Sequence, residues 1–125
     1  MIATRVVESP GRGRGVFATR DLQAGEVIER APVIVIPGDE WEDMQETSLA
    51  DHCFSWGPGL QDAAIVFGHG SFYNHSYAPN ARFERLPEER LMQYVARRAI
   101  AEGEEITINY HEGQESQAPL WFTVT

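Results

Sequence analysis

The sequence predicts a mostly β protein that folds as a single domain. Its 125 residues are close to the commonest size of one domain and leave little room for a second module. Extended runs rich in β-branched and aromatic residues recur along the chain, and turns that contain glycine or proline separate them. Hydrophobic residues make up 42% of the chain, which includes three tryptophans, and this favours an ordered core over disorder.

The first third of the chain is predicted to be rich in strands. Residues 2–8 and 15–18 favour two strands on either side of a glycine-rich turn. Residues 21–26 predict a second turn, which leads into the β-branched run at 27–36. We expect Pro32 to interrupt this long strand or to confine it to a sheet edge, because proline cannot donate a backbone hydrogen bond.

The middle of the chain changes character. Residues 39–51 are acidic, and the spacing of Trp41 and Met44 indicates a helix. Residues 52–56 predict a short strand. Residues 61–67 are a short apolar run that is either a helix or a buried strand, since periodicity does not distinguish the two.

The last third returns to strands. Residues 81–86 and 91–96 flank the turn residues 87–90 and predict a hairpin. A further glycine turn then precedes a predicted strand at residues 106–110. Residues 111–125 form a tail that is first polar and then apolar.

The charge of the chain limits its partners. The 10 basic and 19 acidic residues give a net charge of −9. Direct nucleic-acid binding is not expected, because proteins that follow phosphate backbones carry an excess of lysine and arginine. The acidity instead favours a cationic partner, such as a basic protein or lysine-rich peptide. The alternative is that the charge serves only to keep the protein in solution.

The single cysteine, Cys53, excludes an internal disulfide and a cysteine-based zinc cluster. This usage is consistent with a reducing compartment. The first residues lack the apolar run of a signal peptide, and no stretch approaches the roughly 18 apolar residues of a membrane span. We therefore expect a soluble protein of the cytoplasm, or of the nucleus or nucleoid, with no membrane association.

Three glycines alternate with arginines in residues 11–15. Such a segment lets the backbone approach a ligand closely and present its amide groups. It is not a phosphate loop, which needs Gly-Lys-Ser/Thr, and it is not a dinucleotide-binding turn, because a strand rather than a helix follows. The alternative is a plain tight turn with two exposed arginines.

Residues 72–81 combine polar and aromatic side chains around Asn74 and His75. An asparagine offers donors and an acceptor together, which suits a ligand that carries an ammonium and a carboxylate group. No second histidine or carboxylate lies at metal-ligand spacing, so we expect no metal at His75. The alternative is a buried turn whose polar groups satisfy one another.

Tyr110 is predicted to end the strand at 106–110 and to precede polar residues. At such a position the ring can pack while the hydroxyl points into a cleft, where it can orient a nucleophile. Taken alone, a tyrosine at the rim of the fold is the simpler interpretation.

The order of these motifs is more informative than any one of them. Gly-Arg-Gly at 13–15, Asn-His-Ser at 74–76 and Gly-Glu-Glu-Ile-Thr-Ile-Asn-Tyr at 103–110 resemble the SET-domain family of protein lysine methyltransferases. The resemblance runs over residues 4–122 and is greatest to the minimal stand-alone members of viruses and bacteria.

The resemblance implies a SET-domain fold over residues 1–125. This fold is a set of small antiparallel sheets with a C-terminal pseudoknot, in which one segment passes through a loop formed by another. The implied core spans residues 4–110, with a variable insert that contains short helices at about 38–66. The tail at 111–125 would close the active site.

The resemblance also implies an activity: transfer of methyl groups from S-adenosylmethionine, without a metal, to lysines of a histone, histone-like or ribosomal protein, with S-adenosylhomocysteine as the product. The implied catalytic residue is Tyr110. The implied cofactor-binding residues are Arg12, Gly13, Arg14, Gly15, Tyr73, Asn74, His75, Tyr110 and Trp121. The implied substrate-channel residues are Phe83, Ile108, Tyr110 and Trp121. The alternative is a catalytically weak SET module that binds cofactor or a basic peptide.

The sequence departs from the family pattern at several positions. Asn109 stands where relatives often have aspartate, and Arg14 stands where they often have an aromatic residue. Tyr77 replaces a cysteine of zinc-bearing relatives, which implies that no zinc is bound. Apolar residues at Phe83 and Ile108 imply room for multiple methylation. The minimal viral members act as homodimers, so the resemblance also allows a homodimer.

Overall fold

The computed structural model describes residues 3–111, 114 and 116–120. The elements in chain order, with η denoting a 3-10 helix, are β1 (Thr4–Ser9), β2 (Gly13–Ala18), β3 (Val27–Ile36), α1 (Gly38–Met44), η1 (Ser48–His52), β4 (Cys53–Trp56), η2 (Pro58–Leu60), β5 (Asp62–Val66), η3 (Gly70–Phe72), β6 (Asn74–His75), β7 (Ala81–Leu86), β8 (Leu91–Ala96) and β9 (Glu105–Ile108). The prediction of a mostly β protein is therefore confirmed.

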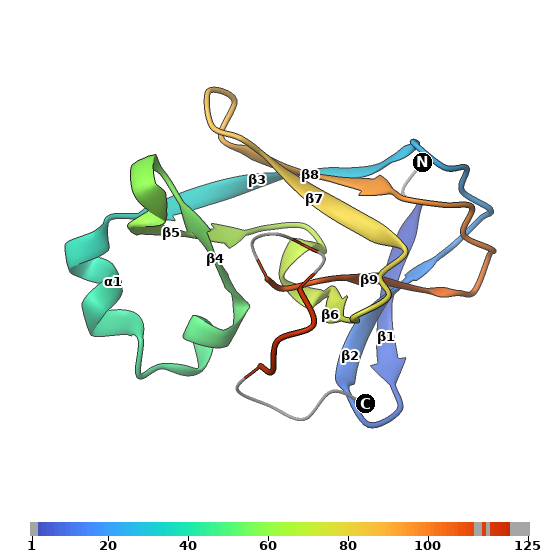
Figure 1. Ribbon diagram of the computed structural model, residues 1–125, viewed down its shortest axis with the longest axis horizontal. Helices are drawn as coiled ribbons and strands as arrows, with labels where there is room; N and C mark the ends of the chain where they lie inside the picture. Colours follow the sequence, from blue (N-terminus) through green and yellow to red (C-terminus); the bar gives the residue numbers. More distant parts are fainter. Residues whose placement is uncertain (1–2, 112–113, 115, 121–125) are drawn as a thin grey trace.

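The strands form two sheets, which Figure 1 shows side by side along the long axis of the molecule. One sheet has the order β1-β2-β9-β6, and the other has the order β4-β5-β3-β8-β7. The β7–β8 hairpin is present as predicted, with Leu86 paired to Leu91 beside its turn. Small, mostly antiparallel sheets are the architecture that the SET resemblance implies. None of the helices among the described residues is long and apolar enough to cross a membrane.

The expectation for Pro32 is wrong, because β3 continues through it in the interior of the five-stranded sheet. Residues 27–32 of β3 pair with β8, whereas residues 33–36 pair with β5. The missing N–H of proline therefore falls where the strand changes partners rather than within one continuous ladder. The carbonyl of Pro32 accepts a hydrogen bond from the Phe67 N–H at 2.9 Å.

The central segment also differs from the prediction. The predicted helix at 39–51 is instead the short helix α1 followed by η1. α1 buries none of its residues and has no side-chain cap at its N-terminus, so neither packing nor capping extends it. The strand at 52–56 is confirmed as β4, and the undecided run at 61–67 is the strand β5.

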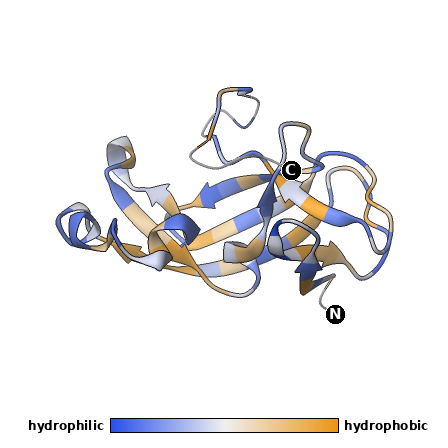
Figure 2. Cartoon of the chain, turned by 90° about the horizontal axis from the view of Figure 1, so that it is seen from below, coloured by the Kyte–Doolittle hydropathy of each residue, from blue (hydrophilic) through white to orange (hydrophobic). Residues whose placement is uncertain are grey.

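Most of the core comes from the strands, along which Figure 2 shows hydrophobic and hydrophilic bands, and Leu22 and Ile100 add to it from an isolated bridge outside them. Its largest fully buried apolar side chains are Tyr94, Leu22, Met92, Ile100, Ile106 and Ile108. The ring of Tyr94 stacks on that of Tyr73 with a centroid distance of 4.2 Å, and its hydroxyl donates to the Gly70 carbonyl at 3.0 Å. This aromatic pair connects the core to the segment that precedes β6.

We expect Met92→Ala to lower the free energy of unfolding by about 2–5 kcal/mol, because its fully buried side chain would leave a cavity. Ile34→Ala, in the same sheet, should change it by only about 0.5 kcal/mol, since that side chain is 55% exposed. Urea denaturation of the two variants beside the wild type measures both effects. Equal losses at the two positions would contradict this assignment of the core.

Candidate active site

The three sequence motifs meet in one sheet, although up to 97 positions separate them in the chain. β9 lies between β2, which contains the Gly-Arg-Gly segment, and β6, which is the Asn-His pair. Val16 of β2 pairs with Ile106, and His75 of β6 pairs with Ile108. The sheet therefore places the predicted cofactor segments on either side of the strand that leads to Tyr110.

β6 and β9 run parallel, which brings the C-terminal strand against the Asn-His segment. The Ser76 N–H donates to the Ile108 carbonyl at 2.8 Å. The Tyr110 N–H donates to His75 Nδ1 at 2.9 Å and continues this contact beyond the end of β9. This close approach is what the predicted pseudoknot requires.

The side chain of His75 is buried and holds the backbone of Tyr110. It is 3% exposed, and because Nδ1 accepts a hydrogen bond, the neutral ring carries its proton on Nε2. Burial lowers the pKa of His75, and the nearby His111 and Arg12 lower it further, so the neutral ring that the hydrogen bond needs is favoured. His75 was predicted to bind cofactor, but its imidazole does not line either of the cavities described below.

The hydroxyl of Tyr110 has a fixed direction. It donates to the Tyr73 carbonyl at 2.7 Å, and its ring meets the His75 ring edge-on with a centroid distance of 5.2 Å. Burial raises the pKa of Tyr110 to about 12, Glu105 adds to the rise, and Arg12 opposes it. The phenol therefore stays protonated at neutral pH and cannot serve there as a ready general base.

Two cavities adjoin at Tyr110. The first, of about 470 Å³, includes Arg12, Gly13, Arg14, Phe72 and Asn74 in its lining. The second, of about 260 Å³, includes Cys53, Phe54, Ser55, Gly70 and Tyr73. Both are also lined by Asp51, His52, Ser71 and Tyr110. Tyr110 thus stands between a cavity lined by two arginines and one lined by Phe54 and Tyr73.

The first cavity brings together five of the predicted cofactor residues, at positions 12–14, 74 and 110. The Arg14 guanidinium lies over the Phe72 ring, 4.6 Å from its centre. Two guanidinium groups and an amide in one cavity suit a small ligand that carries a carboxylate and an ammonium group. A zwitterionic amino-acid end, such as that of S-adenosylmethionine, fits this set of groups.

Gly15, also predicted to bind cofactor, lies behind the wall of the first cavity. A Cβ at Gly15 would lie 2.7 Å from Asn74 Nδ2 and closer still to Glu105 Oε2. Asn74 Nδ2 donates to Glu105 Oε2 at 2.8 Å and to the Arg14 carbonyl at 3.1 Å. The absence of a side chain at Gly15 therefore makes room for the pair formed by Asn74 and Glu105.

Glu105 is a site residue that the sequence reasoning missed. Its Oε1 accepts hydrogen bonds from Ser9 Oγ at 2.8 Å and from Arg12 Nη1 at 3.5 Å. It therefore joins the β1–β2 turn to the Asn-His segment. Its place in the motif at 103–110 was the available signal, but the sequence analysis gave Glu105 itself no role.

Of the predicted channel residues that the structure describes, Tyr110 lines the second cavity, whereas Phe83 and Ile108 do not. Phe83 and Ile108 are 3% and 0% exposed and line neither cavity among the described residues. Phe54 lines the second cavity instead and meets the Phe83 ring edge-on, with a centroid distance of 5.2 Å. Tyr73, predicted to bind cofactor, lines this cavity as well, and its hydroxyl donates to Glu29 Oε1 at 2.8 Å.

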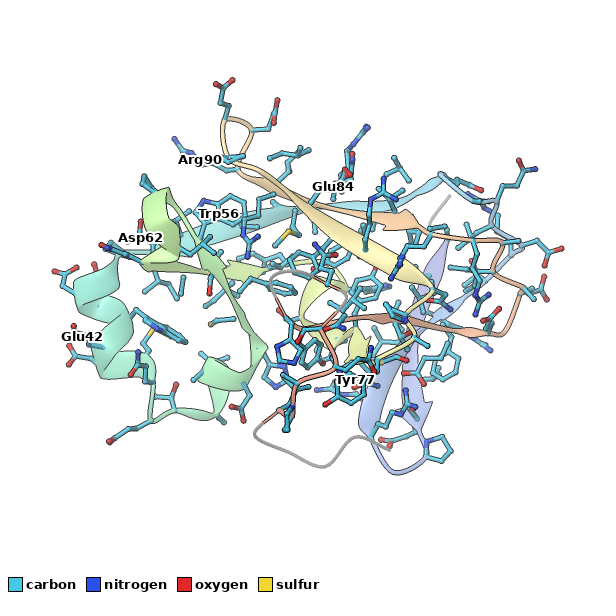
Figure 3. The ribbon with its side chains drawn as sticks, viewed as in Figure 1. Glu42, Trp56, Asp62, Tyr77, Glu84 and Arg90 are labelled. Atoms are coloured by element: carbon cyan, nitrogen blue, oxygen red, sulfur yellow. The ribbon has the colours of Figure 1, made fainter. Side chains whose placement is uncertain are left out.

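The described part of the tail contacts Tyr77 and the backbone of Phe83. Tyr77, labelled in Figure 3, donates from its hydroxyl to the Ala118 carbonyl at 2.9 Å. The Gln114 amide bonds the backbone N–H and carbonyl of Phe83, at 3.0 and 3.1 Å, as a neighbouring strand would. Trp121, predicted to cover the cofactor and line the channel, lies outside the described residues.

A family model described as the SET domain matches residues 13–111, which contain all three motifs. The chain belongs to the SET-domain family. This is a family of protein lysine methyltransferases, so the chain is an enzyme of that class. Within the described residues of this SET domain, no group of three or more histidine, cysteine, aspartate and glutamate side chains could hold a metal ion.

Known proteins resemble this SET domain over most of its length. It is 33% identical over 112 residues to a Schizosaccharomyces pombe protein named "Histone-lysine N-methyltransferase, H3 lysine-37 specific", covering 89% of this chain and 71% of that protein. A Yarrowia lipolytica protein named for H3 lysine-36 is also 33% identical, over 125 residues and 90% of this chain, but the match spans only 16% of that protein.

A solved structure agrees with the fold of this SET domain. The crystal structure of a candidate histone methyltransferase of Plasmodium falciparum superposes with a TM-score of 0.73 at 27% identity. The match covers 90% of this chain and 96% of that chain. The two-sheet arrangement described above is therefore shared with a SET protein of known structure.

Proposed function

We propose that this SET domain transfers methyl groups from S-adenosylmethionine to lysine side chains of a histone or another lysine-rich protein. The observation that carries the proposal is that Tyr110 lines both of the adjoining cavities. The two fungal relatives, which are named as histone-lysine methyltransferases, support the choice of a histone.

The first cavity is the proposed cofactor site. Arg12 and Arg14 can bind a carboxylate, and Asn74 can bind an ammonium group. When bound, S-adenosylmethionine would supply a methyl group carried on a positively charged sulfur. Trp121 was predicted to cover its adenine, and this part of the proposal concerns a residue outside those described.

The second cavity is the proposed lysine site. Phe54, Tyr73 and Tyr110 can pack against the methylene groups of a lysine side chain. The entering lysine must be neutral to act as a nucleophile. The positive charge of bound S-adenosylmethionine would lower the pKa of this lysine, whereas the carboxylate of Asp51 in the same lining opposes that shift.

Tyr110 is proposed to orient this amine. Its hydroxyl donates to the Tyr73 carbonyl, and a phenolic oxygen can accept as well as donate, so Tyr110 can take a hydrogen bond from the amine. A fixed acceptor at the boundary of the two cavities aligns the nitrogen for attack across it. The site thus works by alignment and exclusion of water, and its own residues form no covalent intermediate.

The acidic insert, residues 38–51, favours a basic substrate. It contains Asp39, Glu40, Glu42, Asp43, Glu46 and Asp51 and has no lysine or arginine. Its last two residues, Ala50 and Asp51, line the second cavity. Figure 3 shows Glu42 on α1, at the end of the molecule that is formed by this insert. These charges would raise the local concentration of a lysine-rich segment beside the proposed lysine site.

Neutralising this charge should weaken substrate binding. We expect Glu42→Gln/Asp43→Asn to raise KM for a lysine-rich peptide by about two- to fivefold at low salt, and this difference should shrink at high salt because exposed charges are screened. The control Glu88→Gln/Glu89→Gln removes the same charge from the β7–β8 turn. Steady-state kinetics at two salt concentrations measure both, and an equal rise in KM for the control would contradict a local role.

Calorimetry and mass spectrometry together test the proposed function. S-adenosylhomocysteine should bind to the purified protein in calorimetry, and incubation with S-adenosylmethionine and core histones should add methyl groups to lysine. Cofactor binding with no methylation of any histone or ribosomal protein would instead support a binding module. No cofactor binding at all would refute the proposal.

A further inference from the structure

The side-chain amide of Asn74 is held through its nitrogen, Nδ2. Nδ2 donates both of its protons, to the Arg14 carbonyl at 3.1 Å and to Glu105 Oε2 at 2.8 Å. A carbonyl and a carboxylate can only accept, so the reversed amide would set its oxygen against two acceptors. Among the hydrogen bonds of the described residues none uses Asn74 Oδ1, and Asn74 lines the first cavity.

The carboxylate of Glu105 is itself fixed. Oε1 accepts from Ser9 Oγ and Arg12 Nη1, which leaves Oε2 for Asn74. Its side chain is 16% exposed, and the carboxylate lies where a side chain at residue 15 would otherwise stand. Glu105 therefore cannot turn away from Asn74 without breaking these bonds.

We infer that Glu105 is a positioning residue that keeps Asn74 Oδ1 available to the first cavity as a hydrogen-bond acceptor. Asn74 Oδ1 then favours a ligand that places a hydrogen-bond donor beside it, namely the α-ammonium of an amino-acid end. This inference rests on the proposed function, in which S-adenosylmethionine supplies that ammonium. Without the carboxylate, the amide can rotate and present Nδ2, which repels a cation.

The test compares two ligands that differ only in this group. S-adenosylhomocysteine and its analogue without the α-amino group are titrated by calorimetry, so no turnover is needed. The wild type should prefer the amino form by about tenfold or more, the range of a hydrogen bond to a charged group. Glu105→Met should lose most of this preference.

Two conservative variants separate positioning from general stability. Glu105→Gln can still accept from Asn74 through Oε1 and donate to Ser9 through Nε2, so it should keep most of the preference. Glu105→Asp keeps the charge but withdraws it from Asn74 by one methylene, so it should lose the preference. The Asp variant also decides the matter if Glu105→Met does not fold.

Asp51 is the control for a rival source of the preference, because this carboxylate lines the same cavity. Asp51→Asn should keep the preference for the amino form. The inference is overturned if Glu105→Met and Glu105→Asp weaken the binding of both ligands equally. It is also overturned if Asp51→Asn alone abolishes the preference for the amino form.

The same titrations distinguish failure of this inference from failure of the proposed function. A wild type that binds both ligands with equal affinity refutes the role of Glu105 and leaves the proposed function standing. A wild type that binds neither ligand refutes both.

Discussion

Tyr110→Phe should lower kcat by about 100- to 1,000-fold, the range seen when one preorganised polar group is removed from an active site. Tyr110 lines both cavities, and its hydroxyl is fixed by a hydrogen bond to the Tyr73 carbonyl at 2.7 Å. The phenylalanine ring keeps the packing against His75, so only the orienting oxygen is lost. Affinity for S-adenosylhomocysteine should stay within about twofold of wild type. Single-turnover kinetics and calorimetry measure the two quantities separately.

Tyr94→Phe is the matched control for this experiment. Its hydroxyl also donates to a backbone carbonyl, that of Gly70 at 3.0 Å, and it is fully buried, but it lines neither cavity among the described residues. We expect a loss of about 1 kcal/mol in unfolding free energy and little change in kcat. If both variants lose the same activity, the effect of Tyr110 is one of packing and the proposed role is wrong.

Gly15→Ala should weaken S-adenosylhomocysteine binding by about 10- to 100-fold, because overpacking of this size is usually worth about 1–3 kcal/mol. The new Cβ would collide with Glu105 Oε2 and lie 2.7 Å from Asn74 Nδ2. These two groups hold each other, so any shift that relieves the contact breaks the hydrogen bond between them. Calorimetric titration gives the change in Kd.

Gly103→Ala controls for the general effect of adding a methyl group to a glycine. Gly103 has a φ of +84°, and a Cβ at this position would meet nothing within 4 Å, so alanine there is strained but not crowded. The variant should lose about 1 kcal/mol of stability while the Kd is unchanged. A wild-type Kd for Gly15→Ala would contradict the crowding argument.

The strands could be predicted where turn residues bound an extended run, as in β7 and β8. The run at 61–67 could not be assigned to a helix or a strand. The neighbouring residues Ala63 and Ala64 of β5 are both buried, so the run lacks the alternation of buried and exposed residues that identifies a strand. Pro32 misled the prediction for a different reason. Proline is incompatible with a continuous ladder, and only the tertiary structure shows that β3 changes partners there.

Only part of the candidate site could be predicted from the sequence. The order of the motifs predicted that residues 13–15, Asn74 and Tyr110 belong to one site, and the sheet brings them together. Glu105 was missed because its partner Ser9 is 96 positions away, a contact that no local pattern encodes. Phe54 was missed because a four-residue strand does not reveal which of its faces lines a cavity.

The most direct test of the proposed function is a single-turnover reaction with S-adenosylmethionine and core histones, read by mass spectrometry for the wild type and Tyr110→Phe. The account predicts methylated lysine in the wild-type reaction and a rate about 100- to 1,000-fold lower in the variant. Equal rates for the two proteins, or a wild type that binds the cofactor and methylates no lysine, would contradict it.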